Sequence, residues 1–102
     1  MEFIETSIFL KLSKHLLTDD ELHHLQMALS LYPGMGQVIP SSKGLRKLRW
    51  FSGNRGKRGG LRVIYYCQTE YHQVFLLYIY EKSKREDLTS DQIKILRQLI
   101  EE

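Results

Sequence analysis

Two consecutive apolar runs in the second half of the chain constrain its fold most strongly. They read LRVIYYCQT at 61–69 and VFLLYIYEK at 74–82, and both are rich in the β-branched and aromatic residues that favour strands. The second run is apolar on both faces, which predicts a central strand that is covered on both sides of a sheet. The short segment 70–73 fits a turn, so we expect the two strands to pair in antiparallel fashion.

A third strand is expected just before this pair. Residues 45–51 (LRKLRWF) would place Arg46, Leu48 and Trp50 on one face and Lys47 and Arg49 on the other. The preceding segment 33–44 holds three glycines and both prolines, so we expect a loop without a regular element there. The three strands predict an antiparallel meander, and the alternating EFIE at the N-terminus predicts a further short strand.

Helical patterns flank the predicted strands. Apolar residues recur at helical spacing within 7–17, and capping-box patterns at 18–21 (TDDE) and 89–92 (TSDQ) indicate the starts of two more helices. The resulting order β-α-α-β-β-β-α predicts an α+β fold. Two N-terminal helices and a C-terminal helix would pack on a twisted, mainly antiparallel sheet, in a single domain over residues 1–102.

Basic residues are concentrated in a part of the chain that lacks acids. The stretch 43–66 holds eight Lys or Arg residues, and the longer segment 22–69 contains no Asp or Glu, although the formal net charge of the chain is only +3. Such a segment repels itself unless a polyanion covers it. We therefore expect a phosphate-rich partner, with RNA or DNA first.

Other kinds of chemistry receive little support from the sequence. The four histidines have no partner at i, i+4 and Cys67 is the single cysteine, so we expect no metal site, no cofactor and no internal disulfide. A nucleophilic pair of Cys67 and His72 lacks an orienting third residue, and Glu81, Glu86 and Asp87 fit ordinary solvated charges. No apolar run approaches the ~20 residues of a membrane span, and no secretory signal is evident, so we expect a cytoplasmic protein.

Cations alone can promote the cleavage of RNA. The reaction needs the 2′-hydroxyl to lose a proton, the phosphorane to be stabilised and the 5′-oxygen to leave with a proton. A lysine surrounded by other cations has a lowered pKa, whereas arginine stays charged and offers a planar fork to phosphate. Pairing through the turn at 70–73 would bring residues near 62 opposite those near 81. The candidate catalytic residues are therefore Lys57, Arg62, Tyr80, Lys82 and Lys84. The candidates for holding the RNA backbone are Arg46, Lys47, Arg49, Arg55 and Arg58.

The same residues also have simpler interpretations. Lysines and arginines in loops are most often solvated, Arg62 could be a surface strand residue, and Tyr80 could belong to the core. A non-catalytic RNA- or ribosome-binding module would use the same basic loop, and composition alone favours it over an enzyme. A DNA-binding or antitoxin-like protein is a third possibility, although the sequence has no recognisable helix-turn-helix.

A family resemblance favours the enzyme. The series GLRKLRW, then GNRGKRGG followed directly by LRVIYY, then LLYIYEK and DLT before the last helix, resembles the HigB-type toxins of the RelE superfamily of bacterial toxin–antitoxin systems. The resemblance covers nearly the whole chain, and its specific part is GKRGGLRVIYY. It implies a small α+β ribonuclease that enters the ribosomal A site and cuts translated mRNA, leaving a 2′,3′-cyclic phosphate.

The resemblance also implies a partner and several residue roles. The partner is a helix-turn-helix antitoxin of the HigA type, through which the toxin would contact operator DNA only indirectly. Arg62 matches the arginine of the family's third-strand motif, and Lys57 and Arg58 fall where the family places cations before that strand. The segment after the last strand departs from the family's pattern, so the choice among Tyr80, Lys82 and Lys84 stays open.

Overall fold

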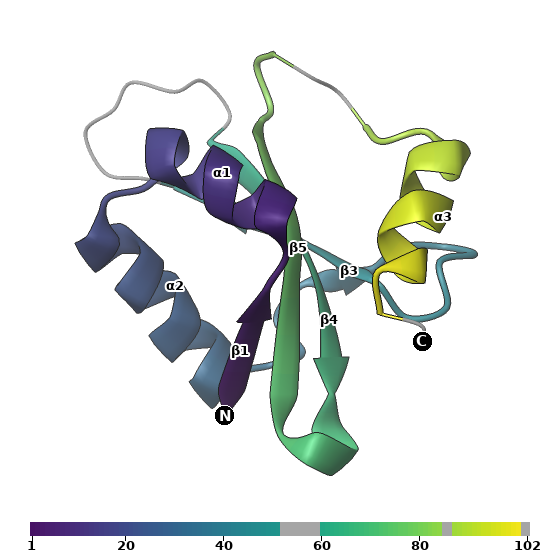
Figure 1. Ribbon diagram of the computed structural model, residues 1–102, viewed down its shortest axis with the longest axis horizontal. Coiled ribbons are helices and arrows are strands. Elements are labelled where there is room, and N and C mark those ends of the chain that lie inside the picture. Colours follow the sequence, from purple (N-terminus) through teal and green to yellow (C-terminus); the bar gives the residue numbers. More distant parts are fainter. Residues whose placement is uncertain (52–59, 85–86, 101–102) are drawn as a thin grey trace.

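The computed structural model of the chain describes residues 1–51, 60–84 and 87–100. Figure 1 shows the path of the chain and the labels of its main elements. In chain order the elements are β1 (Glu2–Glu5), α1 (Ser7–Leu16), α2 (Asp19–Leu31), β2 (Gln37–Val38), β3 (Arg46–Trp50), β4 (Leu61–Gln68), the 3-10 turn η1 (Thr69–Tyr71), β5 (Gln73–Glu81) and α3 (Ser90–Gln98).

The strands form one sheet in the order β1-β5-β4-β3-β2. Strands β2 to β5 pair in antiparallel fashion, whereas β1 runs parallel to β5 at the edge. The predicted meander and the mainly antiparallel sheet are therefore confirmed. Strand β5 has a neighbour on each side, as its two apolar faces predicted. One extra residue, Leu77, lies in β5 where the register shifts between Ile64 and Tyr65, which is a β-bulge.

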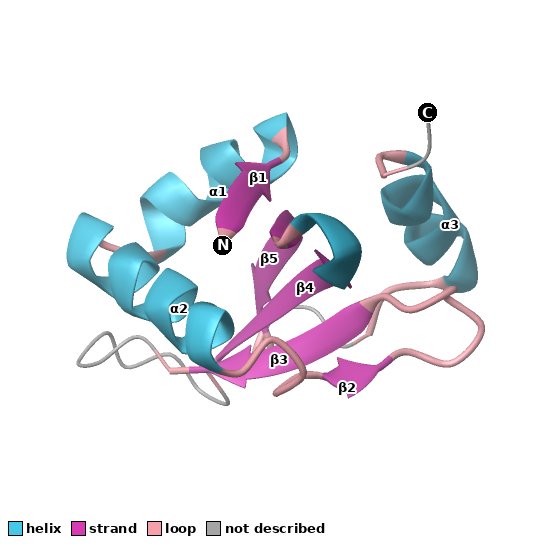
Figure 2. Cartoon of the chain, turned by 90° about the horizontal axis from the view of Figure 1, so that it is seen from below, coloured by secondary structure: helices cyan, strands magenta, loops and turns pink. Residues whose placement is uncertain are grey.

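Helices cover both faces of this sheet (Figure 1 and Figure 2). On one face, α1 and α2 contribute Phe9, Leu25 and Leu29 to a buried cluster with the inward residues of β3, β4 and β5. On the other face, α3 contributes Ile93 and Leu96 to a second cluster. Both clusters exclude water from β4 and β5, and this apolar burial is the main source of the fold's stability.

Capping residues set where the helices begin. The Thr18 hydroxyl accepts the Glu21 N–H at 3.1 Å, and the Glu21 carboxylate accepts the Thr18 N–H at 2.8 Å. The same reciprocal pair forms between Thr89 and Gln92 at the start of α3. Each pair satisfies two backbone donors that have no partner inside the helix. Both predicted capping boxes are therefore confirmed.

The prediction that residues 33–44 contain no regular element is wrong. Gln37 and Val38 pair with Lys47 and Arg46 as the short edge strand β2. The reason is a set of contacts from distant residues that the local sequence does not reveal. The Arg46 guanidinium donates to the Gly36 carbonyl at 2.6 Å and to that of Gly34 at 3.3 Å.

Tyr65 ties the same segment to the sheet. Its hydroxyl accepts the Gly36 N–H at 2.8 Å and donates to the Pro33 carbonyl at 2.9 Å. A Cβ on Gly36 would lie 2.8 Å from the Tyr65 ring, so only glycine allows this close approach of the backbone. The buried tyrosine thereby holds one edge of the hollow described below.

Tyr65→Phe is expected to destabilise the protein by about 1–3 kcal/mol, because it leaves the Gly36 N–H without its acceptor while the ring packing is kept. Urea unfolding followed by circular dichroism measures the free energy of unfolding. Tyr71→Phe is the matched control, since Tyr71 is exposed, and it should change that free energy little. Equal stability of the two variants would contradict the role assigned to the Tyr65 hydroxyl.

Candidate phosphate-binding site

Four basic side chains line one hollow at an end of the sheet. The hollow has a volume of about 540 Å³, and we call its cations, Lys47, Arg49, Arg62 and Lys82, the first cationic cluster. The remaining described residues of its lining are Met35, Gln37, Leu48 and Asp87. Two of the cations come from β3, one from β4 and one from the turn after β5. Three separate segments therefore bring positive charge to one place.

Strand register determines this convergence. Arg62 pairs directly with Arg49 on one side and with Tyr80 on the other. Side chains at directly paired positions point to the same face of a sheet. The expectation that residues near 62 lie opposite residues near 81 is confirmed, since Leu61 pairs with Glu81. The predicted face of Lys47 and Arg49 is also confirmed, because they pair with Ile64 and Arg62, which lie two residues apart in β4.

Arg62 is buried, with 8% of its surface exposed. The interpretation of Arg62 as a surface residue is therefore wrong. Its Nη1 donates to the Leu61 carbonyl at 3.2 Å, and this bond helps to orient the guanidinium. An arginine directly across from another arginine is unfavourable, but Arg49 is exposed, so solvent screens part of this repulsion. The two guanidinium groups at paired positions can both donate charge-assisted hydrogen bonds to one anion.

Lys82 is held close to the start of β4. Its backbone N–H donates to the Gly60 carbonyl at 3.1 Å, which extends the β4–β5 pairing. Gly60 has a φ of +71°, and a Cβ there would lie 2.8 Å from the Trp50 carbonyl oxygen. The last glycine of the GKRGG motif is therefore required by the backbone, independently of any contact with a ligand.

Asp87 is a member of the site that sequence reasoning missed. Its carboxylate accepts from the Lys47 ammonium at 2.9 Å, and its side chain is 70% exposed. The hydrogen bond and charge of Lys47, followed by the charges of Lys82 and Arg62, lower the pKa of Asp87 below its usual value. Asp87 is thus solvated, as expected, but it lies over the cations. No local pattern could reveal this, because its partner is 40 residues away.

Tyr80 and Lys84 do not line this hollow. Tyr80 is 6% exposed and belongs to the buried cluster under α3, so the interpretation of Tyr80 as a core residue is confirmed. The Lys84 ammonium lies 3.4 Å from the Glu81 carboxylate and is mainly exposed. The structure therefore brings Arg62 and Lys82 together and leaves Lys84 outside.

Arg46 lies on the opposite face of β3 from Lys47 and Arg49. It shares that face with Leu48 and Trp50, as predicted, and its guanidinium is used to bind the carbonyls of the segment before β2. The structure does not place Arg46 with the first cationic cluster. Three further candidates, Arg55, Lys57 and Arg58, lie outside the described residues.

Cys67 is unsuited to nucleophilic catalysis. Burial raises the pKa of its thiol, and the S–H group donates to the Pro33 carbonyl at 3.1 Å. A protonated, hydrogen-bonded thiol is a poor nucleophile. Among the described residues, no group of three or more His, Cys, Asp or Glu side chains could hold a metal ion. No helix in this part of the chain is long and apolar enough to cross a membrane.

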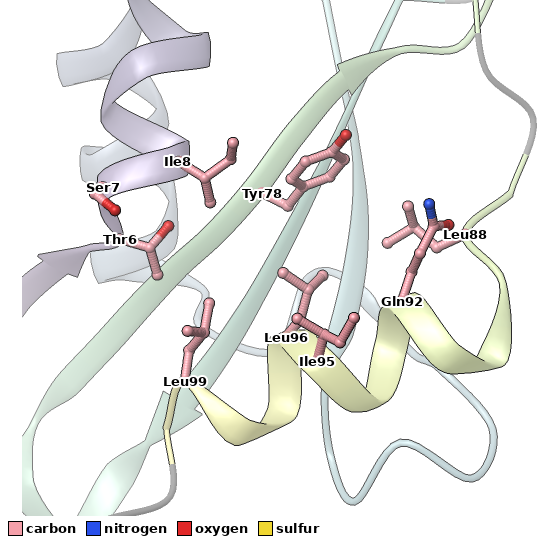
Figure 3. A pocket seen from close by; sticks show the side chains of 9 residues that line it. All are labelled: Thr6, Ser7, Ile8, Tyr78, Leu88, Gln92, Ile95, Leu96 and Leu99. Carbon is pink, nitrogen blue, oxygen red and sulfur yellow. The ribbon is translucent and has the colours of Figure 1, made fainter.

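A separate hollow of about 540 Å³ lies between the start of α1 and helix α3 (Figure 3). Ile8 and Tyr78 face Ile95, Leu96 and Leu99 across it. None of the described residues in its lining carries a charge. This hollow offers apolar contacts, whereas the hollow of the first cationic cluster offers positive charge.

The structure has an α+β fold of the RelE type, which confirms the predicted fold class. It is similar to the solved structure of a double arginine-to-alanine variant of the E. coli toxin RelE in the free state, with a TM-score of 0.61 and 12% sequence identity. The match covers 99% of this chain and 97% of that one. At this identity the likeness concerns the fold. No family model matches the sequence.

Replacing Lys47 tests the electrostatics of the cluster. Lys47→Gln should raise the pKa of Asp87 toward its usual value, because it removes the hydrogen bond and the charge that lower it most. The carboxyl carbon resonance of Asp87, followed by NMR during a pH titration, reports this pKa. Lys84→Gln is the control, since Lys84 pairs with Glu81 instead, and it should leave the titration of Asp87 unchanged. A titration of Asp87 that is unaffected by Lys47→Gln would contradict the described contact.

Proposed function

We propose that this protein is a ribosome-dependent endoribonuclease toxin of a toxin–antitoxin pair, which cleaves translated mRNA and thereby inhibits translation. The observation that carries the proposal is Arg62, a buried guanidinium directly across from Arg49 and beside a hollow that Lys47 and Lys82 also line. The RelE-type fold supports the class. So does the resemblance of the GKRGGLRVIYY motif to HigB-type toxins.

The proposed reaction is an internal transfer at phosphorus. The 2′-oxygen of the ribose attacks the adjacent phosphorus as its proton leaves, and the bond from phosphorus to the 5′-oxygen breaks as that oxygen gains a proton. The products are a 2′,3′-cyclic phosphate and a 5′-hydroxyl. Arg62 and Arg49 would stabilise the extra negative charge on the phosphorane, because their guanidinium groups stay charged and are already in place.

Proton exchange needs a second group beside these arginines. Lys82 lines the same hollow as Arg62, so we assign this role to Lys82, with Lys57 as the second candidate on the loop before β4. Tyr80, buried directly beside Arg62 in the strand pairing, would act as a positioning residue. Lys84, which is paired with Glu81, would contribute at most a peripheral contact with RNA.

The ribosome would position the RNA, which this small site cannot do alone. Holding the 2′-oxygen in line with the scissile bond can provide a large part of the rate enhancement, and we propose that the ribosomal A site holds the message in this way. We further propose a helix-turn-helix antitoxin of the HigA type as partner, with operator DNA bound only through that antitoxin. The toxin would act in the cytoplasm, where translation occurs.

Arg62→Gln tests the proposed role directly. It should relieve growth arrest in a bacterium that expresses the toxin, and should lower cleavage by roughly 10²–10³-fold, the usual effect of losing one group that stabilises transition-state charge. Primer extension on cellular mRNA measures cleavage as new 5′ ends at codons. Circular dichroism verifies that the variant folds, and Lys14→Gln on the exposed side of α1 is the control with the same loss of charge.

Two results would oppose the proposal in different ways. Full toxicity of folded Arg62→Gln would remove Arg62 from the active site. If the unchanged protein arrested growth without creating new 5′ ends, the protein would be a non-catalytic RNA- or ribosome-binding module that uses the same cations.

A further inference from the structure

A second cationic hollow lies beside helix α3, away from Arg62. It has a volume of about 290 Å³ and lies between the 41–43 loop and α3. We call its three basic residues, Lys43, Lys94 and Arg97, the α3 cluster. The other described residues of the lining are Ser41, Ser42, Ile93 and Gln98, so no carboxylate belongs to the described lining. A hollow of this composition suits an anionic ligand.

An aromatic ring supports both walls of this hollow. The Arg97 guanidinium carbon lies 4.8 Å from the centroid of the Tyr66 ring, and a Cβ on Gly44 would lie 3.2 Å from the same ring. Tyr66 itself packs against Phe75, with 6.4 Å between the ring centroids. The cation–π contact restricts the guanidinium, so the shape of the hollow is set before any ligand arrives.

The loop wall is also fixed by buried contacts. Ser42 is 3% exposed. Its hydroxyl donates to the Ile39 carbonyl at 2.6 Å and accepts the Leu45 N–H at 3.0 Å. On either side of this serine, Ser41 and Lys43 adopt a φ of 59°, which is uncommon for residues other than glycine. The loop therefore presents the exposed Lys43 at a defined position, opposite Lys94 and Arg97.

A smaller hollow of about 240 Å³ shares lining residues with both cationic hollows. It has Lys47 and Asp87 in common with the hollow of the first cationic cluster, and Ile93 in common with the hollow of the α3 cluster. The rest of its described lining is aliphatic and aromatic, namely Ile39, Pro40, Ile64, Tyr80 and Leu88. Positive charge at both ends with apolar surface between them matches single-stranded nucleic acid, in which charged phosphates alternate with flat apolar bases.

We propose that the α3 cluster binds a backbone phosphate of RNA. The α3 cluster and the first cationic cluster would then be two parts of one continuous RNA-binding surface. The choice of RNA as ligand rests on the proposed function, but the inference does not require cleavage. An acidic protein segment would also satisfy the charge. The apolar lining of the hollow that shares residues with both cationic hollows favours nucleic acid, because a base has a flat apolar face and a protein carboxylate does not.

The test removes two exposed charges and leaves the packing intact. Lys43→Gln combined with Lys94→Gln keeps Arg97 on Tyr66, and both lysines are exposed. Binding of a fluorescent single-stranded RNA with uncleavable 2′-O-methyl riboses is measured over a range of KCl concentrations. The double variant should bind more weakly at low salt, and the slope of log K against log salt should fall by about 0.7 for each phosphate that the protein no longer neutralises.

Lys11→Gln combined with Lys14→Gln is the matched control, because it removes two exposed charges from α1 on the other face of the sheet. It should leave the salt slope unchanged. A second assay, cosedimentation with ribosomes, distinguishes the source of the phosphate. Weaker binding of the free RNA assigns it to the message, and weaker binding of ribosomes alone assigns it to ribosomal RNA.

Unchanged binding of both free RNA and ribosomes by the Lys43/Lys94 double variant would overturn the inference. If that variant instead bound only its antitoxin more weakly, the α3 cluster would be a site for an acidic protein segment, and the inference would again be wrong. Failure of the proposed function has a different signature. The unchanged protein would then create no new 5′ ends in cells, while the salt slope of RNA binding would still depend on Lys43 and Lys94.

Discussion

The pairing of β4 with β5 is the interaction on which the rest of the structure depends. Both strands are buried on both faces, under α1 and α2 on one side and under α3 on the other. The two strands pair from Leu61 and Glu81 to Gln68 and Gln73, with one β-bulge at Leu77. That register puts Arg62 beside Tyr80 and across from Arg49. No described residue of α3 lines the hollow of the first cationic cluster.

The placement of these cations opposes stability and favours binding. Like charges directly opposite on neighbouring strands are destabilising, with cross-strand pairs contributing roughly 0.2–1 kcal/mol in either direction. The apolar ladder of β4 and β5 is extensive enough to tolerate this cost. Residues kept in an unfavourable arrangement by a stable scaffold are typical of functional sites, where activity and stability make different demands on the same positions. The gathering of Lys47, Arg49, Arg62 and Lys82 around one hollow suits an anionic ligand.

The elements that depend on local signals could be predicted from the sequence. Apolar runs predicted the long strands, and the capping boxes of Thr18 and Thr89 predicted the starts of two helices. What could not be predicted depends on distant contacts. The pairing of β2 requires Arg46 to reach the carbonyls of the glycine-rich segment. The position of Asp87 requires Lys47, which lies 40 residues earlier. Sequence pattern placed Arg46 on the correct face of its strand, but only the structure shows that its guanidinium binds the backbone.

Asp87 allows the first cationic cluster to exist both without a bound anion and with one. Its carboxylate offsets part of the positive charge around Lys47. Because Asp87 is exposed, the contact requires little desolvation and is correspondingly weak. A phosphodiester that contacts Arg62, Arg49 and Lys47 together gains several charge-assisted hydrogen bonds, whereas Asp87 gives up only one and returns to water. An exposed carboxylate can therefore reduce repulsion among the cations without blocking the ligand, which a buried carboxylate at the same place could not do.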